Sequence, residues 1–267
     1  MLDFINVNQY EEACDLSIVP GENKLFTTEF LRKDAIIFCK TDFIQYLFDN
    51  LKFSSRKYVL VTNYSDYPIN ADRFSKKPAC IKKWFAINVE HKHPDLIAVP
   101  LGLYSSKGHT KNVFIKFDID WFLNNRDRLY ANEKNIEELY CNWGTTNANR
   151  NIIIDKLKDN NLKYYWESGL TTEQYYENMS KYKFVISPPG NGTDCFRTYE
   201  SLYFNCIPVV IKHPLYDNWK DLPIIQVNDY SEVTYDLLYS YLNKEYNIEK
   251  LYMTYWRNLI RNTFNNL

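Results

Sequence analysis

The most informative part of the chain is residues 183–211, KFVISPPGNGTDCFRTYESLYFNCIPVVI. Its first apolar run, Phe184 to Ile186, predicts a short buried strand, and the prolines and glycines at positions 188–192 turn the backbone out of that strand. The run Ile207 to Ile211 is rich in β-branched residues, as central parallel strands are. We expect the segment between the two runs to be a helix. Together they predict a β-α-β unit, and with it an α/β fold.

The loop of this unit leads into the start of a helix, which is a structure suited to binding an anion. Thr193 or Asp194 is predicted to cap the helix, and Asn205 to end it. Free backbone N–H groups and the helix dipole favour a phosphate at such an end. Arg197 lies in the first turn and Glu200 three residues later, so both side chains point to one side of the helix.

Two interpretations of this loop are open from the pattern alone. The stretch has neither a G-x-x-x-x-G-K-[ST] phosphate loop nor the third glycine of the dinucleotide fingerprint. Gly190 and Gly192 could serve only to make a tight turn, with Arg197 and Glu200 as a surface pair that contributes about 0.2–0.5 kcal/mol. The other interpretation is that the loop and the two charged residues bind an anion.

Residues 187–210, S-P-P-G-N-G-T-D-C-F-R-T-Y-E-S-L-Y-F-N-C-I-P-V-V, resemble the C-terminal half of exostosin-like glycosyltransferases (glycosyltransferase family 47-like). The resemblance is densest over residues 136–230, and Asn205 stands where the family more often has glycine. The string H-P-D-L-I-A-V-P-L-G-L at residues 93–103 is similar to the N-terminal lobe of the same group.

The resemblance implies a GT-B fold, in which two Rossmann-like lobes have parallel sheets facing across a cleft and a C-terminal helix crosses back. It implies that the C-terminal lobe binds a nucleotide-sugar donor, with Arg197 at the diphosphate and Glu200 at the ribose or sugar. The donor-binding residues implied in this way are Arg197, Glu200, Asn142, Ser187, Gly190, Asn191, Gly192, Thr193 and Asp194. It also implies an inverting transfer without a bound metal ion. A UDP-sugar is favoured as donor, and a GDP-sugar is the alternative.

The length of 267 residues allows two compact lobes. We expect an acceptor-side lobe over residues 1–112, a donor-binding lobe over 113–246 and a C-terminal helix over 247–267 that packs back toward the first lobe. The loop-like stretch 104–110 is the expected hinge. Residues 1–34 are predicted to be irregular.

The other predicted elements follow apolar runs and capping signals. Strands are predicted at 35–39, 57–62, 96–100, 138–142, 162–166 and 222–227. Helices are predicted from a Thr41 or Asp42 cap to residue 50, and at 118–134, 149–160, 171–182, 231–242 and 247–264. Residues 82–88 fit either a helix or a strand. Thr171 and Gln174 form a predicted capping box, and Ser231 is a predicted cap.

The general base of a transfer reaction has three candidates. Asp66 follows the strand at 57–62, and loops at the carboxyl ends of parallel strands commonly hold active-site residues. Its alternative role is that of an ordinary turn residue beside Pro68. His91 and His93 lie in a polar loop and could contact the acceptor or take its proton. They are not expected to bind a metal, because no third ligand is evident.

Composition excludes several classes of function. The net charge of −1 gives no basic excess for nucleic acid. Aromatic residues make up 17% of the chain, which fits contact with sugars but also a tyrosine-rich core. The six cysteines show no metal-binding spacing and are expected to be reduced core residues. Without a signal peptide or a transmembrane run, a cytoplasmic location in a bacterium or a virus-infected cell is expected.

Two functions therefore stand as hypotheses. The first is a glycosyltransferase that moves a sugar from a nucleotide-sugar to a hydroxyl of a glycan or another acceptor. The second is a non-catalytic α/β protein that binds a nucleotide or a sugar. A nicotinamide-dependent oxidoreductase is disfavoured by the incomplete glycine fingerprint.

Overall fold

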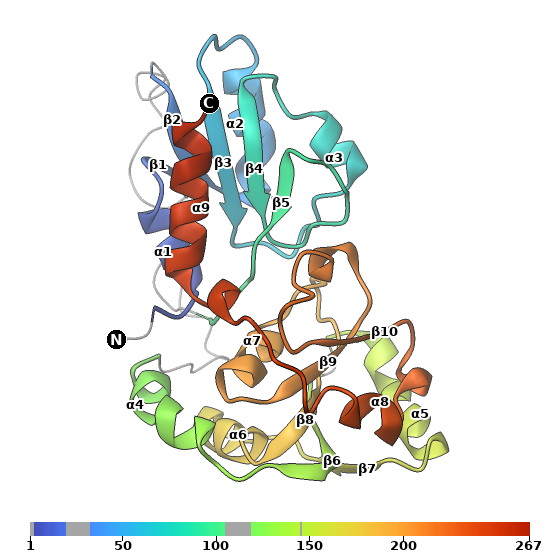
Figure 1. The fold of residues 1–267 in the computed structure, drawn as a ribbon. Helices are drawn as coiled ribbons and strands as arrows, with labels where there is room; N and C mark the ends of the chain where they lie inside the picture. The colour runs from blue at the N-terminus through green and yellow to red at the C-terminus, as the bar shows by residue number, and fades with distance from the viewer. Residues whose placement is uncertain (1–2, 20–32, 105–118, 145) are drawn as a thin grey trace.

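A computed structural model describes residues 3–19, 33–104, 119–144 and 146–267. These residues form two lobes, each built on a five-stranded parallel β-sheet (Figure 1). The predicted α/β class with two Rossmann-like lobes is confirmed. The predicted boundary at residue 112 and nearly all of the predicted hinge at 104–110 lie outside the described residues.

The N-terminal sheet follows the order of the chain, so each strand pairs with the next. Its strands are β1 (Leu16–Ile18), β2 (Ala35–Lys40), β3 (Tyr58–Asn63), β4 (Ile81–Ala86) and β5 (Leu96–Ala98). The strands predicted at 35–39 and 57–62 are confirmed as β2 and β3, and both are almost completely buried. Residues 82–88, whose sequence fits either a helix or a strand, contribute to strand β4.

The first residues of the chain are more regular than predicted. Asn6 and Gln9 form a capping box that starts helix α1 (Val7–Glu12). Strand β1 pairs with β2 in the register Leu16↔Ile37. A three-residue strand is too short to show alternation, and its partner lies about twenty residues further along the chain. The prediction of an irregular segment is therefore wrong for α1 and β1.

The two faces of the N-terminal sheet are covered by different parts of the chain. Helices α2 (Ile44–Leu51) and α3 (Ala71–Ser75) pack on the face that carries Ile37 and Leu60. Helices α1 and α9 (Met253–Asn265) pack on the opposite face, and Figure 1 shows α9 lying along this sheet beside α1. Helix α2 follows a short 3-10 turn, η2 (Thr41–Phe43), and the predicted cap from Thr41 or Asp42 is not formed.

The C-terminal sheet has the order β10-β9-β8-β6-β7. Its strands are β6 (Asn135–Cys141), β7 (Lys163–Trp166), β8 (Tyr182–Ile186), β9 (Ile207–Ile211) and β10 (Ile225–Val227). All five were predicted, and β10 is shorter than the predicted 222–227.

Helices connect and flank these strands on both faces. They are α4 (Ile119–Tyr130), η3 (Ala148–Ile152), α5 (Ile153–Asp159), α6 (Thr172–Met179), α7 (Phe196–Tyr203), η4 (Pro214–Tyr216), η5 (Tyr230–Glu232), α8 (Tyr235–Tyr239) and η6 (Glu249–Leu251). The capping box at Thr171 and Gln174 is confirmed. The prediction that Ser231 caps the following helix is wrong. Thr234 caps α8 instead, and its side chain accepts a hydrogen bond from the Leu237 amide.

The lobes are joined by more than one chain segment. The Tyr203 hydroxyl, on α7, accepts a hydrogen bond from the Ile5 amide at 3.1 Å and donates to the Leu251 carbonyl at 2.7 Å. The Phe4 ring packs edge-on against the Tyr203 ring, with centroids 4.7 Å apart. One buried side chain therefore ties the N-terminal segment, α7 and the segment before α9 together.

Candidate anion site and interlobe cavity

The strand order of the C-terminal sheet creates a natural site between β6 and β8. The chain moves outward from β6 to β7 in one direction and from β8 to β10 in the other. Two strands flank such a reversal of direction, and the loops at their carboxyl ends run apart. The crevice between these loops is where open α/β sheets bind ligands. Here these ends are Asn142 after β6 and Ser187 after β8. The segment 188–195 and helix α7 follow Ser187.

Arg150, in η3, holds the loop after β8. Its guanidinium donates four hydrogen bonds, to the carbonyls of Pro188 (3.1 Å), Pro189 (2.9 Å) and Gly144 (3.0 Å) and to the Thr146 hydroxyl (3.0 Å). The residue is 7% exposed. Burial and the nearby charge of Arg197 both lower its pKa. Arg150 therefore fixes the shape of the loop and brings a positive charge to the crevice.

Arg150 was not predicted from the sequence as a site residue. A signal was present, because Arg150 stands in the first turn after the loop that leaves β6, as Arg197 does after the loop that leaves β8.

Arg197 lies in the first turn of α7 and faces the same region. Its Nε is buried and has no hydrogen-bond partner among the described residues, and none of their carboxylates is close enough to form an ion pair with it. Burial alone would lower its pKa, but Tyr175, Cys195 and Glu200 together raise it. We call Arg150 and Arg197 the arginine pair. Two neighbouring cations without a carboxylate partner form a site that favours an anion.

Glu200 lies one turn after Arg197, as predicted, and is 7% exposed. Its two carboxylate oxygens accept hydrogen bonds from the hydroxyls of Tyr176 (2.8 Å) and Tyr175 (2.9 Å), both on α6. Burial raises the pKa of Glu200, although these hydrogen bonds and Arg197 act in the opposite sense. The tyrosines hold the carboxylate in one orientation, so Glu200 is a fixed acceptor beside Arg197.

Asp194 contacts the other lobe. Its Oδ2 accepts hydrogen bonds from the Leu101 amide (3.0 Å) and the Tyr199 hydroxyl (2.7 Å), and its own amide donates to Asn88 Oδ1 (2.9 Å). The cap of α7 is Cys195, without a side-chain cap bond, so the predicted cap from Thr193 or Asp194 is wrong. The reason is tertiary, because the Asp194 side chain is held by Leu101 rather than by the first turn of α7.

The other predicted donor residues lie in the segments that directly follow β6 and β8, and they differ in how far their side chains are buried or bonded within the protein. The Ser187 hydroxyl is buried and shares a hydrogen bond with the Thr198 hydroxyl at 2.9 Å. Asn142 donates to the Glu167 carbonyl at 3.1 Å. Asn191 is exposed and Thr193 half-buried.

The two glycines of the loop have different surroundings. A Cβ on Gly192 would lie 3.1 Å from the Asn88 side chain, so glycine lets the lobes approach closely there. A Cβ on Gly190 would lie 3.4 Å from Arg150, which is an ordinary contact.

A cavity of about 340 Å³ lies between the lobes, and we call it the interlobe cavity. Residues 63–66 and 87–88, at and after the ends of β3 and β4, line one side, and residues 190–192 and 194–196 line much of the other. Tyr64 and Asn88 have left-handed backbones, with φ of 65° and 51°. Such conformations are strained for a bulky residue and cluster at functional sites. Asp66 is exposed and lines this cavity, close to the loop that precedes Arg197.

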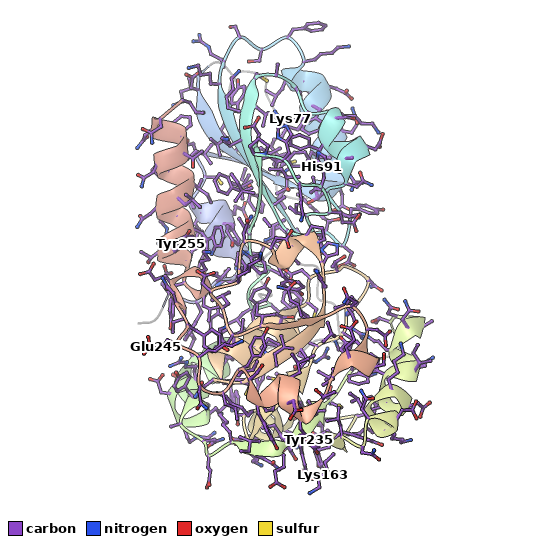
Figure 2. The ribbon with its side chains drawn as sticks, turned by 45° about the vertical axis from the view of Figure 1, so that its right-hand side comes forward. Lys77, His91, Lys163, Tyr235, Glu245 and Tyr255 are labelled. Atoms are coloured by element: carbon purple, nitrogen blue, oxygen red, sulfur yellow. The ribbon has the colours of Figure 1, made fainter. Side chains whose placement is uncertain are left out.

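His91 and His93 line a different cavity, of about 510 Å³, together with Pro214 and Asp217 of the C-terminal lobe. Both imidazoles pack against Phe74 of α3, with ring centroids 5.3 and 4.6 Å away. Figure 2 labels His91 on the α3 side of the upper lobe, away from Tyr255 of α9. The structure thus places Asp66, but not the two histidines, in the interlobe cavity.

In comparisons with known proteins, no family model matches the chain and no curated protein matches it. Within the described part of the chain, no group of three or more His, Cys, Asp or Glu side chains is placed to hold a metal ion. The described helices also include none long and apolar enough to span a membrane.

Proposed function

We propose that the protein is a glycosyltransferase of GT-B type that takes a nucleotide-sugar as donor. The observation that carries the proposal is the arginine pair at the strand-order reversal, where two cations have no carboxylate partner among the described residues. A diphosphate carries the negative charge that such a pair favours. Arg197 can donate hydrogen bonds to phosphate oxygens, whereas Arg150, with four of its N–H groups bound within the protein, contributes mainly its charge. Glu200, oriented by two tyrosines, would accept hydrogen bonds from a ribose or sugar hydroxyl.

The proposed reaction is a single displacement at the anomeric carbon. An acceptor hydroxyl in the cleft attacks this carbon, the bond to the nucleoside diphosphate breaks, and a carboxylate takes the hydroxyl proton. Asp66 is the proposed proton acceptor, because it alone of the three predicted bases lines the interlobe cavity. The charge that develops on the leaving diphosphate is stabilised by Arg197, by Arg150 and by the N-terminal end of α7.

The first test measures the melting temperature with UDP-, GDP-, CMP- and dTDP-sugars, because a ligand that prefers the folded state raises it. We expect a selective shift that Arg197→Ala abolishes and that Arg56→Ala, at an exposed site of the N-terminal lobe, leaves unchanged. Release of the leaving nucleotide (UDP, GDP, dTDP or CMP) is then measured by mass spectrometry. Arg197→Ala should lower the turnover rate by roughly 10²–10³-fold, as loss of a group that stabilises developing charge does. A normal turnover rate in Arg197→Ala would show that Arg197 does not stabilise the leaving group.

Binding without turnover is the second proposed function. It needs only the arginine pair and Glu200, and it needs no proton acceptor in the interlobe cavity. A melting-temperature shift with no release of the leaving nucleotide under any acceptor would support this function against the first.

A further inference from the structure

The charges that line the interlobe cavity differ from those of the arginine pair. Asp66 and Asp194 line it, and none of its described lining residues is Lys, Arg or His. A negative group placed there would meet two carboxylates and no compensating cation. The cavity therefore disfavours an anion, in contrast to the neighbouring crevice between β6 and β8.

Two lining residues keep a buried polar atom without a hydrogen-bond partner among the described residues. These atoms are Nδ2 of Asn63 and Oδ1 of Asp194. The second polar atom of each side chain is held within the protein. Asn63 Oδ1 accepts a hydrogen bond from the Tyr64 amide at 2.7 Å, and Asp194 Oδ2 accepts from the Leu101 amide and the Tyr199 hydroxyl. One unpaired donor and one unpaired acceptor fit hydroxyl groups, which can both accept and donate hydrogen bonds.

Aromatic rings form part of the remaining lining. Tyr64 comes from the N-terminal lobe, and Tyr104 packs edge-on against Phe196 of α7 with ring centroids 5.5 Å apart. Aromatic faces pack favourably against the C–H faces of sugar rings, while fixed amide and carboxylate groups orient the hydroxyls.

We infer that the interlobe cavity is the acceptor subsite and that it selects an uncharged polyhydroxylated acceptor, a neutral sugar, over an acidic one such as a uronic acid or a phosphorylated sugar. This inference rests on the proposed function, because it assigns the second substrate of that reaction. The new element is the charge of the acceptor, which is expected to be neutral. Asp66 would then have two effects on the acceptor: its carboxylate takes the proton of the acceptor hydroxyl, and its negative charge repels acidic acceptors.

The test compares matched pairs of probes on the full chain. Saturation-transfer NMR measures binding of methyl glucoside against methyl glucuronide, and of methyl galactoside against methyl galacturonide. The measurements are made at pH 8, above the pKa of Asp194, which burial raises to about 7. We expect each neutral probe to bind at least tenfold more tightly than its acidic partner.

A charge reversal sharpens this test. Asp66→Lys changes an exposed side chain of the cavity and should shift the preference toward the acidic probes by tenfold or more. Asp49→Lys makes the same change in net charge on an exposed position of α2 and should leave the preference unaltered. Equal binding of neutral and acidic probes, no binding of either, or an equal effect of the two variants would each overturn the inference.

Donor binding is scored separately by the melting-temperature assay. Hexoside binding without any nucleotide-sugar shift would overturn the proposed transferase. A donor shift without hexoside binding would overturn the acceptor subsite alone.

Discussion

Each of the two lobes contains a five-stranded parallel sheet, but the helices that cover the faces of the two sheets come from different parts of the chain. In the N-terminal sheet the strands are in chain order, and the described connections α2 and α3 lie on one face. Right-handed crossovers that always step in one direction place their helices on the same face. The opposite face, with Phe38 and Val61, is covered by α1 and by α9 from the far end of the chain.

The C-terminal sheet covers both of its faces with its own helices. Its order reverses between β6 and β8, so α5 packs on one face while α6 and α7 pack on the other. The same reversal opens the crevice that holds the arginine pair. Strand order therefore explains both why the C-terminal lobe carries the proposed donor site and why the N-terminal lobe depends on α9.

The dependence on α9 predicts the largest effect. Trp256 is 2% exposed between α9 and the N-terminal sheet. Trp256→Ala should lower the free energy of unfolding by about 3–5 kcal/mol, because it leaves a large cavity in the core. Urea denaturation measures the loss, and Asn258→Ala on the exposed side of α9 is the control. Hydrogen exchange should rise in β2 and β3 more than in β8 and β9, and a uniform rise would contradict the comparison.

Within the C-terminal lobe, the two arginines should behave differently. Arg150→Met removes four hydrogen bonds to neutral acceptors and should cost about 2–4 kcal/mol of unfolding free energy. Arg197→Met removes a buried positive charge, and the Nε of this arginine has no hydrogen-bond partner among the described residues. The substitution should therefore leave the unfolding free energy unchanged or raise it. Thermal and urea denaturation of the two variants, side by side, measure the difference. Equal destabilisation would show that Arg197 also serves the fold.

The contact between the lobes should depend on pH through Asp194. Burial raises the pKa of this carboxyl to about 7, against hydrogen bonds that lower it, so the folded protein binds a proton more tightly than the unfolded chain. Its stabilising contribution is then fully present below pH 4 and is lost as pH rises to about 7, by about 2–3 kcal/mol between pH 5 and 8. The other titratable groups that interact with it are tyrosines, Tyr10, Tyr199 and Tyr216.

Asp194→Asn tests this assignment, because it removes the titration and keeps an acceptor oxygen for Leu101. The unfolding free energy of the variant, measured from pH 5 to 8, should fall less with pH than that of the wild type. A parallel pair of curves would assign the pH dependence to other groups.

The smallest expected effect concerns the end of α7. Asn205 has φ of 60°, a conformation in which glycine has no steric cost and alanine costs about 1–2 kcal/mol. Asn205→Gly should change the unfolding free energy by less than about 0.5 kcal/mol, whereas Asn205→Ala should lower it by about 1 kcal/mol. Equal effects of the two substitutions would show that the side-chain contact of Asn205 with Lys183 matters more than the backbone.

Local sequence was sufficient to predict much of this protein. Apolar β-branched runs identified β2, β3 and β9 because buried parallel strands are apolar on both faces. The Thr171 capping box formed as predicted because its bonds join residues only three apart. Arg197 and Glu200 were placed on one side of α7 by helical spacing alone.

Only the tertiary structure decided the features that depend on distant residues. Sequence spacing does not encode the order of strands, so the reversal between β6 and β8 appeared only in the fold. Asp194 was assigned to the donor loop, but the Leu101 amide of the other lobe holds its side chain. Arg150 was overlooked because its acceptors include Pro188 and Pro189, which lie about forty residues further along the chain. Short-range patterns determine helices and strands, whereas long-range hydrogen bonds and charges determine which side chains remain available to a ligand.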